Sequence, residues 1–542
     1  MKDLTAKDLI GKGYFPKEIP KGFSTNSLAE KFSNLDFSTF TKKERGKWYK
    51  TSNISIPKFA HSRRILNVPA PFPQMRLSQL LVKNTEELNE YYSQSKLSLT
   101  RPIVKEESDR AVERKYHFSK IIERRIESIN DKKYILKTDI SRYFPTIYTH
   151  SIPWALHTKE VAKQTRGDSL LGNTIDEYVR NIQDGQTMGL PVGPDTSLII
   201  SEVIGTAIDI KLQEAHPNII GSRYTDDFEF YFKTQSEAEK VLNTIQEIVR
   251  HFELDINPVK TEIISSPNLL EPIWLSNLKL YQFRSSATAQ KNDIKTFFST
   301  AFYYQNQSPY EGVLKYCLKK IKNLKIKEDN WSLFEALILH IMLIDPTTLP
   351  LIENILFGYK EIGYPINEQK IKDTIAEIFA SNIAVGNNYE IMWALSLSNK
   401  LQLKISNESS KLLFNLEDSF SNILTMEAYT NGYIEGGYEP EYFKTLLNEN
   451  ELYGRNWLFA YEMSVKGWLK PHQQKEYVKK DTFYNQLFES KVEFYHNDRK
   501  AEIKNDDWLT ALLNDDDIEE LFIQNASSKK PYLRGGSGGA DY

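Results

Sequence analysis

Three acidic side chains stand where strand-like runs end, and their type suits metal-assisted chemistry. Asp139 closes the apolar run 134–139, and Asp226 and Asp227 lie between the β-like runs 222–224 and 228–232, as at the tip of a hairpin. Two adjacent carboxylates repel each other unless a cation neutralises them, and magnesium prefers a few carboxylates together with substrate phosphates. If the chain brings Asp139 beside Asp226, two Mg²⁺ ions, or Mn²⁺ in their place, would have the ligands needed for in-line phosphoryl transfer. The carbonyl of Ile140 is a further candidate ligand.

Two more segments supply parts that such a reaction uses. Gly189, Pro191 and Gly193 form a rigid turn in 188–197, where the backbone is free to approach a base pair closely. Lys260 follows a predicted helix, and its ammonium would donate a proton to a departing pyrophosphate. Each segment alone is a weak signal, because an Asp-Asp pair is usually a solvated turn and a single lysine is usually at the surface. The order and spacing of all four segments favour a catalytic site.

The elements that must position these residues change in character along the chain. Residues 1–60 contain several prolines and predict an N-terminal arm with short helices. Residues 61–290 alternate short β-like runs with helical patterns, which indicates an α+β body. Residues 291–528 carry apolar side chains at helical spacing and predict an α-helical C-terminal array, either a HEAT-like solenoid or an ordinary irregular helical domain. Residues 529–542 predict a flexible glycine-rich tail.

Composition limits the classes of function. The formal net charge is −3, which argues against a protein that coats nucleic acid indiscriminately. The single cysteine, Cys317, excludes a disulfide framework within one chain and fits a reducing compartment. The most apolar stretch, 197–210, is interrupted by Glu202 and Asp209 before it could span a bilayer, so we expect a cytoplasmic protein with no membrane partner.

One local stretch is basic in spite of the low net charge. Between residues 42 and 64 eight basic side chains accompany a single acidic one, Glu44, and Trp48, Tyr49 and Phe59 lie among them. Cations that contact phosphates, together with rings that stack on bases, are typical of single-strand binding. A solvated charged loop is the alternative.

The four motifs together resemble the palm domain of reverse transcriptases. The resemblance rests on TDISRYF at 138–144, MGLPVGPDTS at 188–197, RYTDDF at 223–228 and NPVKTEI at 257–263, and it covers about residues 55–290. It implies a palm and fingers domain, in which Asp139, Asp226 and Asp227 hold the metal ions. The segment 61–81 is similar to the fingers region, which makes Arg63 and Arg64 candidates for binding the incoming triphosphate.

Two positions refine that resemblance. Phe144 stands where the family places the bulky residue that excludes a ribose 2′-hydroxyl, so the resemblance implies selection of deoxynucleotides. The alternative is a core phenylalanine beside Tyr143. Met188 departs from the family, which commonly has glutamine before this glycine; the nearest glutamine, Gln186, is two residues earlier.

A narrower resemblance comes from the segments 146–157, 456–462 and 482–495. They look like bacterial abortive-infection polymerases of the AbiK type and related defence-associated reverse transcriptases. The resemblance implies a helical C-terminal domain in place of a thumb, homo-oligomers (trimers or hexamers), and single-stranded DNA made either without a template or by copying a noncoding RNA. It also implies that synthesis starts from a tyrosine, which would leave the product covalently attached.

The tyrosine that would act as primer is not fixed by the sequence. Tyr542 is the first candidate, because eight residues of flexible tail after Gly535 would have a reach of roughly 16 Å. Tyr532 and Tyr14 are the next candidates.

Three other functions remain open. An RNA-dependent RNA polymerase would share the palm, and a retron- or maturase-like enzyme would extend a nucleic-acid primer instead of a tyrosine. A non-catalytic helical scaffold with a relic palm is the alternative outside the enzymes.

Overall fold

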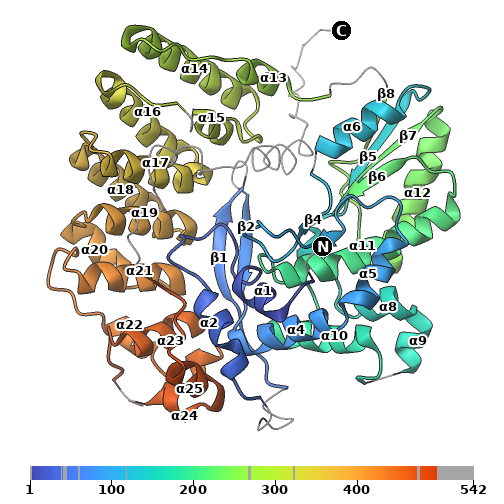
Figure 1. Cartoon of the computed structure of the whole chain (residues 1–542), viewed down its shortest axis with the longest axis horizontal. Coiled ribbons are helices and arrows are strands. Elements are labelled where there is room, and N and C mark those ends of the chain that lie inside the picture. Colours follow the sequence, from blue (N-terminus) through green and yellow to red (C-terminus); the bar gives the residue numbers. More distant parts are fainter. Residues whose placement is uncertain are drawn as a thin grey trace, which may run out of the picture.

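The computed structural model describes residues 3–37, 40, 46–58, 62–117, 119–165, 167–265, 270–321, 324–472 and 476–496. Figure 1 shows two bodies with an antiparallel hairpin between them: a small sheet with its covering helices, and a long series of helices. The predicted α+β body followed by a helical C-terminal array is confirmed. No helix in the described part of the chain is both long and apolar enough to cross a bilayer.

The first body is built on a four-stranded antiparallel sheet with the strand order β6-β7-β5-β8. Its strands are β5 (Tyr134–Asp139), β6 (Gly221–Tyr224), β7 (Asp227–Phe232) and β8 (Glu262–Ser265). The helices of this body are α4 (Pro71–Lys83), α5 (Thr85–Ser93), α6 (Ser119–Ser128), α7 (Tyr143–Thr146), α8 (Ser151–His157), α9 (Lys159–Gln164), α10 (Leu171–Ile182), α11 (Asp195–Ala215) and α12 (Gln235–His251). A short hairpin of β3 (Pro102–Ile103) and β4 (Glu113–Arg114) lies beside them.

The alternation of side chains along the central strands separates a core face from a polar face. Leu136 of β5 and Phe228 and Phe230 of β7 are buried in one hydrophobic cluster with residues of α11 and α12. Successive strand residues point to opposite faces, so Asp139 and Asp227 point away from that cluster. The hydrophobic pattern of the strands therefore fixes the face that carries the carboxylates.

The hairpin between the two bodies comprises β1 (Ser52–Pro57) and β2 (Arg63–Val68), paired antiparallel from Ser52 with Val68 to Pro57 with Arg63. Before it lie α1 (Ala6–Gly11) and α2 (Asn26–Lys31). The second body continues from α13 (Ile273–Lys279) and α14 (Ala287–Gln307) through α15 (Val313–Ile321), α16 (Trp331–Ile344), α17 (Leu349–Glu361), α18 (Glu368–Asn382), α19 (Asn388–Leu401), α20 (Asn407–Leu413), α21 (Ser419–Thr430), α22 (Glu441–Thr445), α23 (Trp457–Lys466), α24 (Tyr477–Lys480) and α25 (Thr482–Glu489).

The N-terminal arm shares its core with the helical array. One hydrophobic cluster joins Ile10 and Tyr14 of the arm, Leu66 of the hairpin, and array residues from Trp274 to Leu487. Tyr49, which we expected to stack on bases, is instead buried at 3% exposure, with its ring 5.0 Å from that of Tyr453. Tyr49 is therefore a packing residue that joins the arm to the array.

Candidate active site

The strand register brings the predicted carboxylates together. Asp139, the last residue of β5, is directly opposite Asp227, the first residue of β7, and the N–H of Ile140 donates to the carbonyl of Asp226 at 3.1 Å. Directly opposed residues of antiparallel strands have side chains on the same face, with Cβ atoms about 5 Å apart. Lys260 completes the group, because its Nζ donates to Oδ2 of Asp139 at 2.6 Å.

The surroundings of these carboxylates oppose their ionisation. Burial raises the pKa of Asp226. Burial and the neighbouring charge of Asp226 raise the pKa of Asp227 well above its ordinary value. Burial also raises the pKa of Asp139, although the ammonium of Lys260 acts in the opposite direction. Each charge is therefore costly where it stands, and a bound cation would lower that cost.

The donor atoms fit a hard divalent cation. Oδ1 of Asp139 is buried and has no hydrogen-bond partner among the described residues, so one carboxylate oxygen is available. Carboxylate oxygens are the ligands that Mg²⁺ prefers. In the described part of the chain no three acidic, histidine or cysteine side chains are already gathered as a finished metal centre. The ammonium of Lys260 now neutralises part of the charge at Asp139. The carbonyl of Ile140 stays a predicted ligand.

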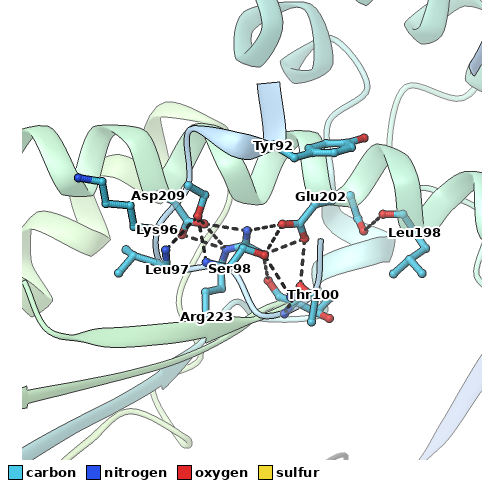
Figure 2. Close-up of polar contacts among 12 residues, drawn as sticks. Tyr92, Lys96, Leu97, Ser98, Thr100, Leu198, Glu202, Asp209 and Arg223 are labelled. Carbon is cyan, nitrogen blue, oxygen red and sulfur yellow. Dashed lines mark hydrogen bonds and ion pairs between the residues drawn. The ribbon is translucent and has the colours of Figure 1, made fainter. Parts of the chain in front are cut away.

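A buried ion network joins the strand that leads into the carboxylate hairpin to helix α11, and Figure 2 shows its members Arg223, Glu202 and Asp209. Arg223 of β6 is fully buried and donates to Asp209 and Glu202 of α11, with Nη2 at 2.8 Å from an oxygen of each. Its Nη1 also donates to the carbonyl of Thr225, the residue before the two aspartates, at 2.9 Å. The N–H of Thr225 donates to Oγ1 of Thr100 at 3.1 Å. These contacts hold the turn although Thr225 has the unfavourable φ of +59°.

This network was not predicted from the sequence, although the sequence carries a signal for it. Glu202 and Asp209 were recognised only as interruptions of an apolar stretch. Charged residues within a buried helix require a partner, and Arg223 directly precedes the predicted hairpin tip. Gly205 is needed in the same place, because an added Cβ would lie 2.5 Å from the Arg223 guanidinium.

The glycine-proline turn lies along the segment that follows Asp139. The N–H of Gly189 donates to the carbonyl of Ile147 at 2.8 Å, and the N–H of Leu190 donates to that of Phe144 at 2.8 Å. Gly189 has φ +91°, and a Cβ there would stand 3.2 Å from the carbonyl oxygen of Pro145. The turn therefore needs glycine for both its conformation and its close approach.

The end of the turn lies against the N-terminal arm. Gly193 has φ +133°, and a Cβ on it would lie 3.1 Å from Cβ of Pro16. Pro191 is buried. Phe144 is half-buried beside Tyr143, with 5.7 Å between the ring centroids. The structure thus brings Phe144 and the turn together, next to the strand that ends in Asp139.

Arg63 and Arg64 are held differently, because successive strand residues point to opposite faces. Arg63 donates to both carboxylate oxygens of Glu390 in α19, at 2.8 and 2.7 Å, and to Oγ of Ser55 at 2.7 Å. These contacts argue against the predicted role of Arg63 in triphosphate binding. Arg64 points the other way, and its charge lowers the pKa of Asp226 against the effect of burial.

Two cations near the carboxylates were missed as site residues. Lys58, the residue after β1, has a pKa lowered by desolvation and by the charges of Lys260 and Arg64. The charges of Asp226 and Asp139 act on this pKa in the opposite sense. Arg114 of β4 also lowers the pKa of Asp226, and its guanidinium lies 5.4 Å from the centre of the Tyr224 ring. Lys58 was counted in the basic stretch, whereas nothing in the sequence singled out Arg114.

The candidate primers fall into two groups. Tyr14 is fully buried, and its hydroxyl donates to the carbonyl of Pro69 at 2.5 Å. A primer must reach the metal ions and then move away as the product grows, so this placement argues against Tyr14. Tyr532 and Tyr542 lie outside the described residues.

Comparison with known families bears on the segment that contains this site. Residues 74–298 match the family model described as "Reverse transcriptase (RNA-dependent DNA polymerase)". This segment is similar to reverse-transcriptase domains. The match includes the three aspartates, Lys260, Phe144 and the glycine-proline turn, whereas the β1–β2 hairpin and most of the helical array lie outside it.

Among solved structures, apo telomerase from Candida tropicalis is similar to the chain at 13% identity and a TM-score of 0.33, over 72% of this chain and 77% of that one. Telomerase from Candida albicans, in complex with a fragment of telomeric RNA, is similar at 14% identity and a TM-score of 0.28, over 73% and 67% of the two chains. At these TM-scores neither similarity supports an argument about function. No curated protein sequence matches the chain.

Proposed function

We propose that the protein is a DNA polymerase of the reverse-transcriptase type that adds deoxynucleotides by two-metal catalysis. The observation that carries the proposal is the register of β5 and β7, in which Asp139 and Asp227 stand opposite each other beside Asp226 and Lys260. The match of residues 74–298 to the reverse-transcriptase family supports it.

Each residue of the site has its own role in the proposed reaction. Asp139, Asp226 and Asp227 hold two divalent ions, with the carbonyl of Ile140 as an additional ligand. When bound, such ions activate the attacking hydroxyl and neutralise charge on the phosphates. The hydroxyl oxygen attacks the α-phosphorus of a deoxynucleoside triphosphate, loses its proton, and displaces pyrophosphate. Lys260 donates a proton to that leaving group. Desolvation would lower the pKa of Lys260, but Asp227 and Asp139 raise it, so the side chain carries its proton before the reaction.

Substrate contacts are assigned to the cations and the ring around the carboxylates. Arg64, with Lys58 beside it, neutralises triphosphate oxygens, whereas Arg63 holds the hairpin in place. Phe144 excludes the 2′-hydroxyl of a ribonucleotide. The turn at Gly189, Pro191 and Gly193 is assigned to the support of the base pair, because its glycines let the backbone approach closely.

The wider role is proposed from the narrower resemblance alone. In this proposal synthesis begins on a tyrosine of the C-terminal tail, Tyr542 or Tyr532, and proceeds either without a template or on a noncoding RNA. Homo-oligomers of the chain would act in antiphage defence in the bacterial cytoplasm. A retron- or maturase-like enzyme that extends a nucleic-acid primer stays the alternative within the same chemistry.

A primer-free reaction tests the proposal. The purified protein is incubated with Mg²⁺ and each labelled deoxynucleotide, and the product is denatured and treated with nuclease or with protease. We expect label that stays on the polypeptide and is lost from a variant carrying both Tyr532→Phe and Tyr542→Phe. Label found only on free nucleic acid contradicts protein priming, and unchanged biological activity in the Asp226→Ala, Asp227→Ala variant supports a non-catalytic scaffold.

A further inference from the structure

Trp48 presents one face of its ring to solvent. This residue precedes β1 in the chain, and its side chain is 59% exposed, whereas the next residue, Tyr49, is 3% exposed and belongs to the core. The core contact of this segment is thus made by Tyr49, so Trp48 is not required as a core residue. A large aromatic side chain that is held at the surface is a candidate for binding.

The inner face of the indole rests flat on the backbone of Gly185. A Cβ added to Gly185 would lie 2.9, 2.9 and 3.0 Å from Cδ2, Cε2 and Cε3 of Trp48. These three atoms belong to one six-membered ring, and a point equally distant from them lies on the axis through the centre of that ring. Gly185 therefore faces the middle of the ring, and any side chain there would displace the indole. Gly185 also has φ +73°, which favours glycine.

Hydrogen bonds fix the segment of Trp48 to the loop that contains Gly185. The N–H of Tyr49 donates to the carbonyl of Asn181 at 3.0 Å, and the N–H of Asp184 donates to that of Tyr49 at 2.8 Å. Nε2 of Gln183 donates to the carbonyl of Gly189 at 2.9 Å. The loop under Trp48 is therefore the loop that leads into the glycine-proline turn beside Phe144.

A cation lies two residues after Trp48 in the chain and is paired with the residue before Gly185. Lys50 is paired with Asp184 at 3.8 Å, and both side chains are about half exposed. An exposed pair of this kind contributes little, so the ammonium can contact a phosphate at low cost. Lys47 is engaged elsewhere, because its Nζ donates to the hydroxyl of Tyr453 at 2.9 Å.

We propose that Trp48 is a stacking platform for an unpaired base of single-stranded nucleic acid, and that Lys50 contacts a phosphate of the same strand. The inference rests on the proposed polymerase function, and it names where the strand lies outside the catalytic centre. Every base has a stacking face, so the platform accepts any sequence. A rigid support on the covered face, an open face and an adjacent cation are the features that such a contact needs.

Binding measured without catalysis tests the platform. The host is the full-length Asp226→Asn variant, and the probes are labelled oligo-U and oligo-dT, followed by fluorescence anisotropy over a range of salt concentrations. Trp48→Ala is expected to weaken binding of at least one probe by about 5- to 150-fold. Trp48→Phe should retain most of the affinity, because a ring remains. The probe that loses more affinity identifies the strand as RNA or as DNA.

Two further variants separate stacking from charge and from general damage. Lys50→Gln should reduce the slope of log Kd against log salt by about 0.7, the value for one single-strand phosphate, whereas Trp48→Ala should leave that slope unchanged. Tyr303, which is 60% exposed on α14, provides the matched control, and Tyr303→Ala should bind like the host. Unchanged affinity in Trp48→Ala, or an equal loss in Tyr303→Ala, overturns the platform.

The test is independent of the polymerase proposal. Loss of binding in Trp48→Ala without any nucleotide incorporation by the wild-type protein would refute the polymerase and keep the platform. Nucleotide incorporation by the wild-type protein, together with unchanged binding by Trp48→Ala, would support the polymerase and refute the platform.

Discussion

The side chains that would do the chemistry are held in a state that favours cation binding. Asp227 has a pKa raised by burial and by Asp226, and one oxygen of Asp139 has no hydrogen-bond partner in the described chain. In their ionised form these buried groups destabilise the folded state, because their charges have lost the hydration that they would have in water. Such costs are concentrated at functional sites, where a ligand removes them.

A prediction at this scale concerns the sugar of the substrate. Phe144→Ala should reduce the preference for deoxynucleotides over ribonucleotides by about 10- to 200-fold, the range for removing a steric contact in a pocket. Competing incorporation of labelled dNTP and rNTP measures the ratio. Phe144→Tyr keeps a ring and should keep the preference. An unchanged ratio in Phe144→Ala would make Phe144 a packing residue beside Tyr143.

At the scale of elements, the carboxylate hairpin depends on helix α11. Arg223→Leu removes the cation that pairs with both Glu202 and Asp209 and leaves two buried acids without it. We expect this variant to lose about 3–5 kcal/mol of unfolding free energy, measured by urea denaturation. Arg250→Leu, on the exposed side of α12, is the control and should change stability by no more than about 0.5 kcal/mol. A similar small loss for both variants would show that the network is dispensable.

A buried acid in α23 makes the array sensitive to pH. Burial raises the pKa of Glu462 to about 8, while the N–H of Phe494 donates to its Oε1 at 2.6 Å. A group with a raised pKa in the folded state binds its proton more tightly there, so its contribution to stability falls as pH rises from about 4.5 to 8. The slope is about 1.4 kcal/mol per pH unit.

Glu462→Gln removes this titration and keeps an acceptor for Phe494. The free energy of unfolding of the variant, measured by urea denaturation, should increase relative to that of the wild-type protein as the pH rises from 5 to 8. Above pH 8 the difference should level off. A constant difference across that range would mean that Glu462 has an ordinary pKa.

The sequence predicted the elements that follow from local patterns. The end of β5 at Asp139, the hairpin at Asp226 and the change to helices were evident from strand alternation, an Asp-Asp turn and helical spacing. The misplaced residues depend on partners far along the chain. Arg63 is bound by Glu390, 327 residues away, and the buried Tyr14 donates a hydrogen bond to the carbonyl of Pro69. Neither contact leaves a signal in the local sequence.

At the scale of the whole molecule, the β1–β2 hairpin belongs to the helical array as much as to the first body. The carbonyl of Asn53 and the N–H of Ser55 both bond to the side chain of Asn388, and Arg63 bonds to Glu390. The hydrophobic core therefore continues across the boundaries proposed from the sequence at residues 60 and 290. The array would position the fingers over the carboxylates.

Arg63→Ala tests this coupling. The substitution leaves Glu390 buried without its cation, so we expect a loss of about 3 kcal/mol and faster amide deuterium exchange in both β1 and α19. Arg284→Ala breaks a pair with Asp293 in which the arginine is 67% exposed, and it serves as the control. Exchange that rises in β1 alone, with α19 unaffected, would refute the coupling.

The central claim is that Asp139, Asp226 and Asp227 together hold the metal ions of a nucleotidyl transfer. Its most direct test is the rate of Mg²⁺-dependent incorporation of labelled deoxynucleotide by the wild type, Asp139→Asn and Asp226→Asn, with thermal unfolding to show that all three are folded. We predict a rate that vanishes with chelator and falls more than about 100-fold in each variant, because a lost metal ligand costs at least as much as a lost supporting contact. Equal rates in the folded variants and the wild type would contradict the account.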